Sequence, residues 1–101
     1  DSERFYLHFA PYAVHVPIQA NERLLPHYTG LDPREAAYAT MVESVDEALG
    51  AILDALERLG VADETAVVFT SDNGGLSAHG RGGEPHTLNA PLRSGKGSFY
   101  E

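Results

Sequence analysis

The stretch "TSDNGG", residues 70–75, places an acid and an amide directly after an apolar run. A carboxylate and an amide carbonyl are hard oxygen donors of the kind that bind Ca²⁺ or Mg²⁺. Asp72 and Asn73 are therefore candidate metal ligands. The alternative is a simple turn, because Asn-Gly is a favoured hairpin pair, although the residues that follow do not look like a returning strand. The pattern alone leaves both interpretations open, and a full shell needs six or more ligands.

Two more residues have side chains that could act on an anion. His15 lies in "PYAVHVP", where Pro11 and Pro17 prevent regular pairing, so we expect it on an irregular loop. Lys96 stands between two glycines in "SGKG", which would let an anion approach closely. Each could equally be an ordinary surface residue. The end of "LRSGKG" resembles a phosphate-binding loop, but Ala90 and Gly97 occupy the positions of its first glycine and its hydroxyl residue, which excludes that interpretation.

Other kinds of chemistry have less support. The chain has no cysteine, which excludes thiolate metal sites and cysteine nucleophiles. His79 and His86 could form a zinc pair, but nothing in their spacing fixes such a site. With 15 acids against 7 bases the formal charge is −8, and no basic stripe appears, so nucleic acid is a poor partner. No apolar run approaches the roughly 20 residues of a membrane span.

A long helix is the element that the sequence predicts most strongly. Asp32-Pro33-Arg34-Glu35 combines a capping acid, a proline at the first helical position and a glutamate at the third. Apolar residues then alternate spacings of four and three, and Gly60 supplies a left-handed stop. The pattern predicts an unbroken helix over 33–59 whose apolar face packs on a sheet; the apolar positions are Tyr38, Val42, Val45, Leu49, Ile52, Leu56 and Leu59.

Two apolar runs flank this helix and predict strands at 4–10 and 65–71. Strand, long helix and strand together predict an α/β fold with a βαβ unit, in which the strands are parallel and the helix is a crossover connection. Ligands bind beyond the carboxyl ends of parallel strands. We therefore expect His15 and Asp72 at the same edge of the sheet, within about 10 Å of each other. Residues 72–97 are expected to form a long, functional loop.

Four segments resemble, in this order, the central part of a sulfatase of the arylsulfatase type. They are "PYAVHVPIQA", "YATMVESVDEALGAILDALERLG", "TAVVFTSDNGG" and "NAPLRSGKGSFYE". The resemblance covers nearly the whole chain and implies a sandwich of the alkaline-phosphatase type, in which residues 1–101 form one incomplete segment of the catalytic domain. It also implies hydrolysis of sulfate esters, small molecules or sulfated sugars, with Ca²⁺ or else Mg²⁺. By the matching motifs, Asp72 and Asn73 would bind the metal, while His15 and Lys96 would contact the sulfate and the leaving oxygen.

The chain departs from the family pattern at the nucleophile. The family makes a formylglycine from the Cys or Ser of a [CS]-x-P-x-R motif, which is absent here. We therefore expect the parent protein to be active and this chain alone to be inactive. Members of this family are often periplasmic, secreted or lysosomal. Two alternatives stay open: a phosphonate or phosphate-diester hydrolase of the same superfamily, and an acidic α/β segment without enzymatic function.

Overall fold

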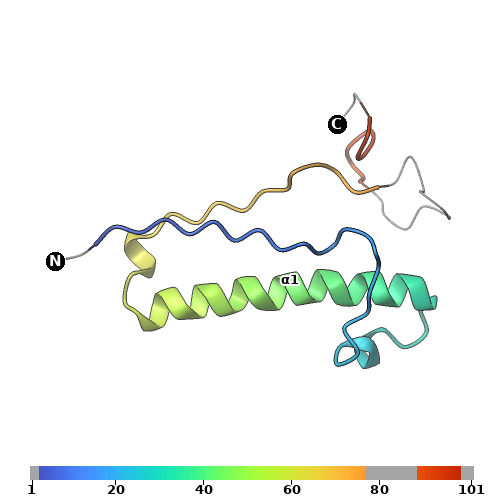
Figure 1. Ribbon diagram of the computed structural model, residues 1–101, viewed down its shortest axis with the longest axis horizontal. Coiled ribbons are helices and arrows are strands. Elements are labelled where there is room, and N and C mark those ends of the chain that lie inside the picture. Colours follow the sequence, from blue (N-terminus) through green and yellow to red (C-terminus); the bar gives the residue numbers. More distant parts are fainter. Residues whose placement is uncertain (1–2, 77–88, 99–101) are drawn as a thin grey trace. The chain divides into compact units, whose positions relative to one another are not determined.

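The computed structural model describes residues 3–76 and 89–98 of the chain. They divide into two compact units, Asp1–Thr65 and Ala66–Glu101, each of which is described by itself. The first unit contains the regular elements: the 3₁₀ helix η1 (Leu25–Tyr28), the α-helix α1 (Pro33–Arg58) and the 3₁₀ helix η2 (Ala62–Glu64). The chain runs one way through residues 3–12 as an extended trace, turns at residues 13–17, and later returns through α1 (Figure 1). No helix over the described ranges is long and apolar enough to cross a membrane.

The helix prediction is confirmed, including both ends. α1 runs unbroken through Gly50 from Pro33 to Arg58. The Asp32 carboxylate accepts hydrogen bonds from the backbone N–H groups of Arg34 at 2.9 Å and Glu35 at 3.4 Å, which satisfies two donors that the first turn leaves without partners.

The C-terminal end of α1 is a Schellman motif built on a glycine. Gly60 takes a positive φ of 69°. Its N–H donates to the carbonyl of Glu57 at 2.9 Å, and the N–H of Val61 donates to that of Leu56 at 3.1 Å. These are the two bonds that define the motif, and they require a left-handed residue between them.

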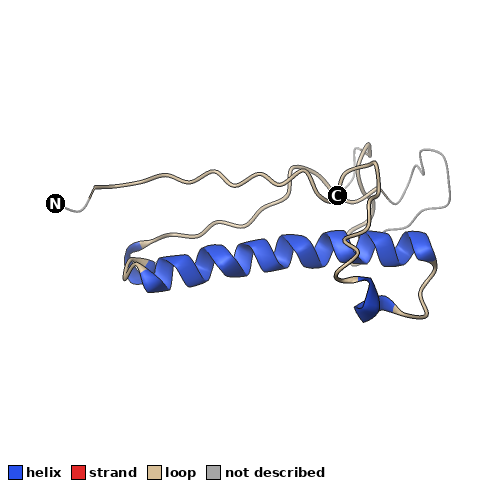
Figure 2. Ribbon diagram, turned by 60° about the horizontal axis from the view of Figure 1, so that its bottom comes forward, coloured by secondary structure: helices blue, strands red, loops and turns tan. Residues whose placement is uncertain are grey.

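The α/β prediction, with a βαβ unit in an alkaline-phosphatase-like sandwich, is wrong for this structure. Figure 2 contains helices and loops, and no residue within 3–76 or 89–98 is assigned to a strand. The apolar runs at 4–10 and 65–71 lack the ladder of backbone hydrogen bonds that makes a strand. An apolar composition does not supply that ladder, and two strands alone are marginal in water.

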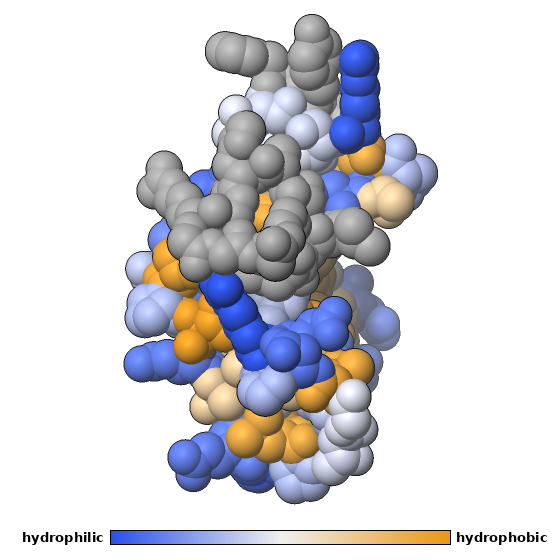
Figure 3. Space-filling view, turned by 90° about the vertical axis from the view of Figure 1, so that its right-hand side faces the viewer, coloured by the Kyte–Doolittle hydropathy of each residue, from blue (hydrophilic) through white to orange (hydrophobic). Residues whose placement is uncertain are grey.

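Without a sheet to cover them, most apolar side chains of the described residues are not buried. In the helix stripe that was expected to pack on a sheet, only Leu56 is buried. The core is small: Leu24, Ala36 and Leu56 are the buried apolar residues among those described. Apolar side chains reach the surface (Figure 3), and the flanking runs contribute many of them: Phe5, Tyr6, Leu7, Phe9, Val67, Val68 and Phe69.

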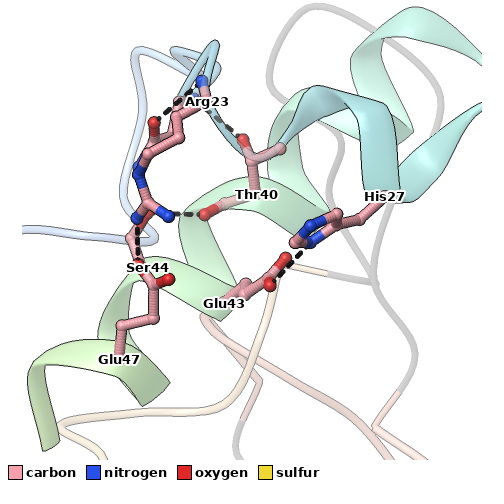
Figure 4. A network of polar contacts seen from close by, with 7 residues as sticks. Arg23, His27, Thr40, Glu43, Ser44 and Glu47 are labelled. Atoms are coloured by element: carbon pink, nitrogen blue, oxygen red, sulfur yellow. Dashed lines mark hydrogen bonds and ion pairs between the residues drawn. The ribbon is translucent and has the colours of Figure 1, made fainter.

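A polar network fixes the segment before η1 against α1. Thr40 is completely buried; its hydroxyl accepts from the N–H of Asn21 at 2.9 Å and donates to the carbonyl of Ala37 at 2.7 Å. The Asn21 side chain donates to Ser44 Oγ at 3.0 Å. The ion pair of Arg23 with Glu47 and a hydrogen bond from His27 Nδ1 to a Glu43 carboxylate oxygen at 2.8 Å complete the network (Figure 4).

We expect Thr40→Val to destabilise the chain by about 1–3 kcal/mol, because it leaves the Asn21 N–H without its acceptor. Thr40→Ser keeps the hydroxyl and should retain most of the stability. Urea unfolding followed by circular dichroism at 222 nm measures the difference. Equal stability of the Val and Ser variants would contradict the role assigned to this hydroxyl.

The Arg23–Glu47 pair predicts a pH dependence of stability. The hydrogen bond and charge of Arg23 hold the pKa of Glu47 below its ordinary value of 4.5. A lowered pKa in the folded state means that the unfolded chain binds more protons, so this contribution is fully present above about pH 4.5 and is lost as the pH falls through the folded pKa. The stability difference between the wild type and Glu47→Gln should therefore be larger at pH 6 than at pH 3 in urea titrations. A difference that is the same at both pH values would rule out this contribution.

Candidate active site

The second unit brings three of the four candidate residues together. Asp72, Asn73 and Lys96 line one open hollow of about 280 Å³, together with other residues of 71–74 and 94–98 and with Leu92. The Asp72–Asn73 corner and the glycine-flanked Lys96 are separated by more than 20 residues of sequence, yet they border the same space. The hollow therefore combines a carboxylate, an amide and the chain's only lysine.

The Asp72–Asn73 corner presents oxygen atoms. The Asn73 side-chain nitrogen donates to Asp72 Oδ1, and the Ser71 hydroxyl donates to the Asn73 carbonyl at 2.6 Å. The Asn73 side-chain oxygen is buried and has no hydrogen-bond partner among the described residues. A buried polar oxygen without a partner is costly, and a cation that accepted this oxygen as a ligand would remove that cost.

The corner is held against the Lys96 loop by hydrogen bonds at Gly75. The N–H of Lys96 donates to the carbonyl of Gly75 at 3.0 Å. The Asn89 side chain forms two hydrogen bonds with Gly75: it accepts from the Gly75 N–H at 2.9 Å and donates to the Gly75 carbonyl at 3.0 Å. A Cβ on Gly74 would approach Gly95 Cα to 3.1 Å, so the close approach of the two loops favours glycine at position 74.

His15 belongs to the first unit, so its expected proximity to Asp72 stays a prediction. It lies in an irregular turn that contains cis peptide bonds at Ala13–Val14 and Val16–Pro17. Its ring is exposed and lies 5.3 Å from the ring of Tyr12, measured between centroids. His79 and His86, the conceivable zinc pair, lie outside the described residues, which contain no cluster of three or more His, Asp or Glu side chains suited to a metal.

The contacts of His15 indicate which ring nitrogen carries a proton. Nδ1 lies 2.9 Å from the Val16 carbonyl oxygen and 3.3 Å from the Tyr12 hydroxyl, which itself donates to the same carbonyl at 3.2 Å. A carbonyl oxygen can only accept, so Nδ1 must be the donor. In the neutral ring, Nε2 is then the nitrogen that carries no proton.

Sequence reasoning missed Asn89 and Ser71 as parts of this site. Asn89 stands in "NAPLRSGKG", a segment that was already notable for its lysine. Its partner Gly75 is 14 residues away, and no local pattern of helix, strand or turn links the two positions. The signal available was an asparagine in a loop where backbone groups need side-chain partners.

Comparison with known proteins identifies the family. The sulfatase family model matches residues 1–98. This chain belongs to the sulfatase family. It is 35% identical over 97 residues to mouse arylsulfatase J, 38% identical over 110 residues to a sulfatase of Formosa agariphila and 38% identical over 99 residues to human N-acetylgalactosamine-6-sulfatase.

These alignments cover nearly all of this chain but a small part of each relative. They include 95% of the chain and 15% of arylsulfatase J, and 96% of the chain with 19% and 17% of the other two proteins. The resemblance to sulfatases is confirmed, and the chain corresponds to less than a fifth of the length of these relatives.

We expect the neutral His15 ring to carry its proton on Nδ1, because the Val16 carbonyl requires a donor there. Long-range ¹H–¹⁵N correlation spectra of the ¹⁵N-labelled chain distinguish the two tautomers. His8 is the internal comparison, since no ring hydrogen bond is assigned to it in the part of the chain that the structure describes. A spectrum with the His15 proton mainly on Nε2 would contradict the assigned hydrogen bond.

Proposed function

We propose that the protein to which this chain belongs hydrolyses sulfate esters, and that this segment supplies part of the metal and sulfate site. The observation that carries the proposal is the hollow shared by Asp72, Asn73 and Lys96. A metal-binding corner beside an ammonium group is suited to an anionic ester. Membership of the sulfatase family supports the choice of a sulfate ester as that anion.

The donor set of the corner fits a hard divalent cation, Ca²⁺ or alternatively Mg²⁺. The Asp72 carboxylate is exposed, and the Asn73 side-chain oxygen is buried without a partner among the described residues. These two oxygens would form part of a shell that needs six to eight ligands for Ca²⁺. The remaining ligands would come from other parts of the protein.

Lys96 and His15 would act on the ester itself. A bound cation polarises the sulfate oxygens and offsets their charge. Lys96 is half-buried at the hollow, where its ammonium group can stabilise the charge that develops in the transition state. His15, with Nδ1 occupied by the Val16 carbonyl, would contact the sulfate and exchange a proton with the leaving oxygen through Nε2.

The nucleophile would come from the rest of the protein as a formylglycine. This chain has no cysteine and no serine followed by Pro and Arg at the required spacing. The segment would then contain groups that polarise the ester but no nucleophile that attacks it. The chain alone should therefore not turn over substrate. Relatives named as an arylsulfatase and as an N-acetylgalactosamine-6-sulfatase support testing both aryl sulfates and sulfated sugars.

In the full-length protein, Asp72→Ala should weaken Ca²⁺ binding and remove most sulfatase activity together. Lys96→Ala should lower kcat by about 10²-fold or more, by analogy with the loss of one preorganised donor. The measurements are p-nitrophenyl sulfate hydrolysis, with Ca²⁺ added and then chelated, and Ca²⁺ calorimetry. Asp54→Ala, an exposed acid on α1, is the matched control and should change neither quantity.

Three outcomes would overturn the proposal. One is turnover by the isolated chain, and another is an unchanged rate in full-length Asp72→Ala. The third is a preference for p-nitrophenyl phosphate or a phosphate diester over the sulfate, which would assign the site to phosphoryl chemistry instead.

A further inference from the structure

The Asn89 side chain bonds both backbone polar groups of Gly75. Its amide oxygen accepts from the Gly75 N–H at 2.9 Å, and its amide nitrogen donates to the Gly75 carbonyl at 3.0 Å. Both backbone polar groups of one residue are therefore satisfied by one side chain. An amide is the side-chain group that offers an acceptor and a donor side by side, as a peptide group does.

Gly75 is also the point where the two loops of the hollow are joined. Its carbonyl accepts a second hydrogen bond, from the Lys96 N–H at 3.0 Å, which uses both of the oxygen's lone pairs. A Cβ on the adjacent Gly74 would lie 3.4 Å from the Asn89 side-chain oxygen and 3.4 Å from the Lys96 backbone nitrogen. The three segments at 74–75, 89 and 95–96 are thus in close contact.

We propose that Asn89 is a positioning residue that sets the distance between the Asp72–Asn73 corner and Lys96. Asn89 does not line the hollow, so it acts through the residues that do. Gly75 follows the candidate ligand Asn73 by two residues, and Lys96 is bonded to Gly75 directly. The role assumes the proposed function, in which the corner binds the cation and Lys96 contacts the sulfate.

The chemistry of position 89 makes the proposal specific. Asn89→Ala removes both hydrogen bonds to Gly75. Asn89→Asp keeps an acceptor for the Gly75 N–H but loses the donor, and it places a negative oxygen beside the Gly75 carbonyl. The two variants therefore separate the two bonds: alanine should release both Gly75 and Lys96, whereas aspartate should mainly disturb the carbonyl side that Lys96 shares.

The experiment uses the full-length protein and begins with hydrogen exchange followed by mass spectrometry. Peptides that contain Gly75 and Lys96 should exchange about tenfold faster or more in Asn89→Ala, because two net hydrogen bonds are lost. In Asn89→Asp, the Lys96 peptide should lose more protection than the Gly75 peptide. This readout needs neither bound Ca²⁺ nor sulfatase activity.

Calorimetry and enzyme kinetics then test whether the contact between the two loops affects Ca²⁺ affinity and turnover. Asn89→Ala should weaken Ca²⁺ binding less than Asp72→Ala does, because both oxygen ligands remain. It should lower kcat for p-nitrophenyl sulfate by tenfold or more, with a smaller change in KM, since the cation and Lys96 would no longer be aligned for the transition state.

Asn21→Ala is the matched control, because Asn21 also bonds through its side chain but in the first unit, to Ser44 and Arg23. It should affect stability without changing Ca²⁺ affinity, kcat or exchange of the Gly75 and Lys96 peptides. Unchanged exchange in both Asn89 variants would overturn the positioning role, as would the same losses in Asn21→Ala. If exchange increases while Asp72→Ala leaves Ca²⁺ binding intact, the contact between the loops stands and the proposed metal site fails.

Discussion

In both units of this chain, side chains of loop residues supply hydrogen-bond partners to backbone groups that lie outside regular secondary structure. Buried N–H and carbonyl groups need partners, and an unpaired one costs about as much as a lost hydrogen bond. In the first unit, the Asn21 N–H finds the buried hydroxyl of Thr40, and the Asn21 side chain bonds Ser44. In the second, Asn89 satisfies both polar groups of Gly75. The positions of η1 on α1, and of the Lys96 loop on the Asp72–Asn73 corner, depend on these few bonds.

Features that depend on residues close together in the sequence were predicted correctly, whereas the strands, which depend on distant partners, were not. The cap at Asp32 and the Schellman motif at Gly60 are set by residues within five positions of each other, and the sequence predicted both ends of α1. The strands at 4–10 and 65–71 were predicted from apolar content, which is a property of one segment. A strand exists through bonds to another segment, and the described residues form no such ladder.

The residues of the candidate site also fall into two groups: those that could be predicted from the sequence and those that could not. Asp72, Asn73 and Lys96 could be selected by residue type and by their resemblance to sulfatase motifs, and the structure places these three around one hollow. Asn89 could not be selected, because its importance lies in two bonds to a residue 14 positions away. The same holds for Gly74, whose small size matters only because Gly95 approaches its position closely. Motifs identify groups that can do chemistry, while the residues that align those groups become visible from contacts.

The charge of the chain makes that alignment more demanding. A formal charge of −8 repels an anionic ester, although salt screens exposed charges beyond about 8 Å at physiological ionic strength. Attraction at the hollow must therefore come from the groups nearest the ester, and Lys96 is the chain's only lysine. A cation at the Asp72–Asn73 corner would offset the Asp72 charge and turn an acidic corner into a favourable one. Because Coulomb attraction falls with separation, the proposed cation and Lys96 would act together on one sulfate only while the two loops stay close. The Asn89–Gly75 contact and the small residue at position 74 hold the Asp72–Asn73 corner close to the Lys96 loop. In this way, hydrogen bonds outside the hollow would affect the chemistry proposed within it.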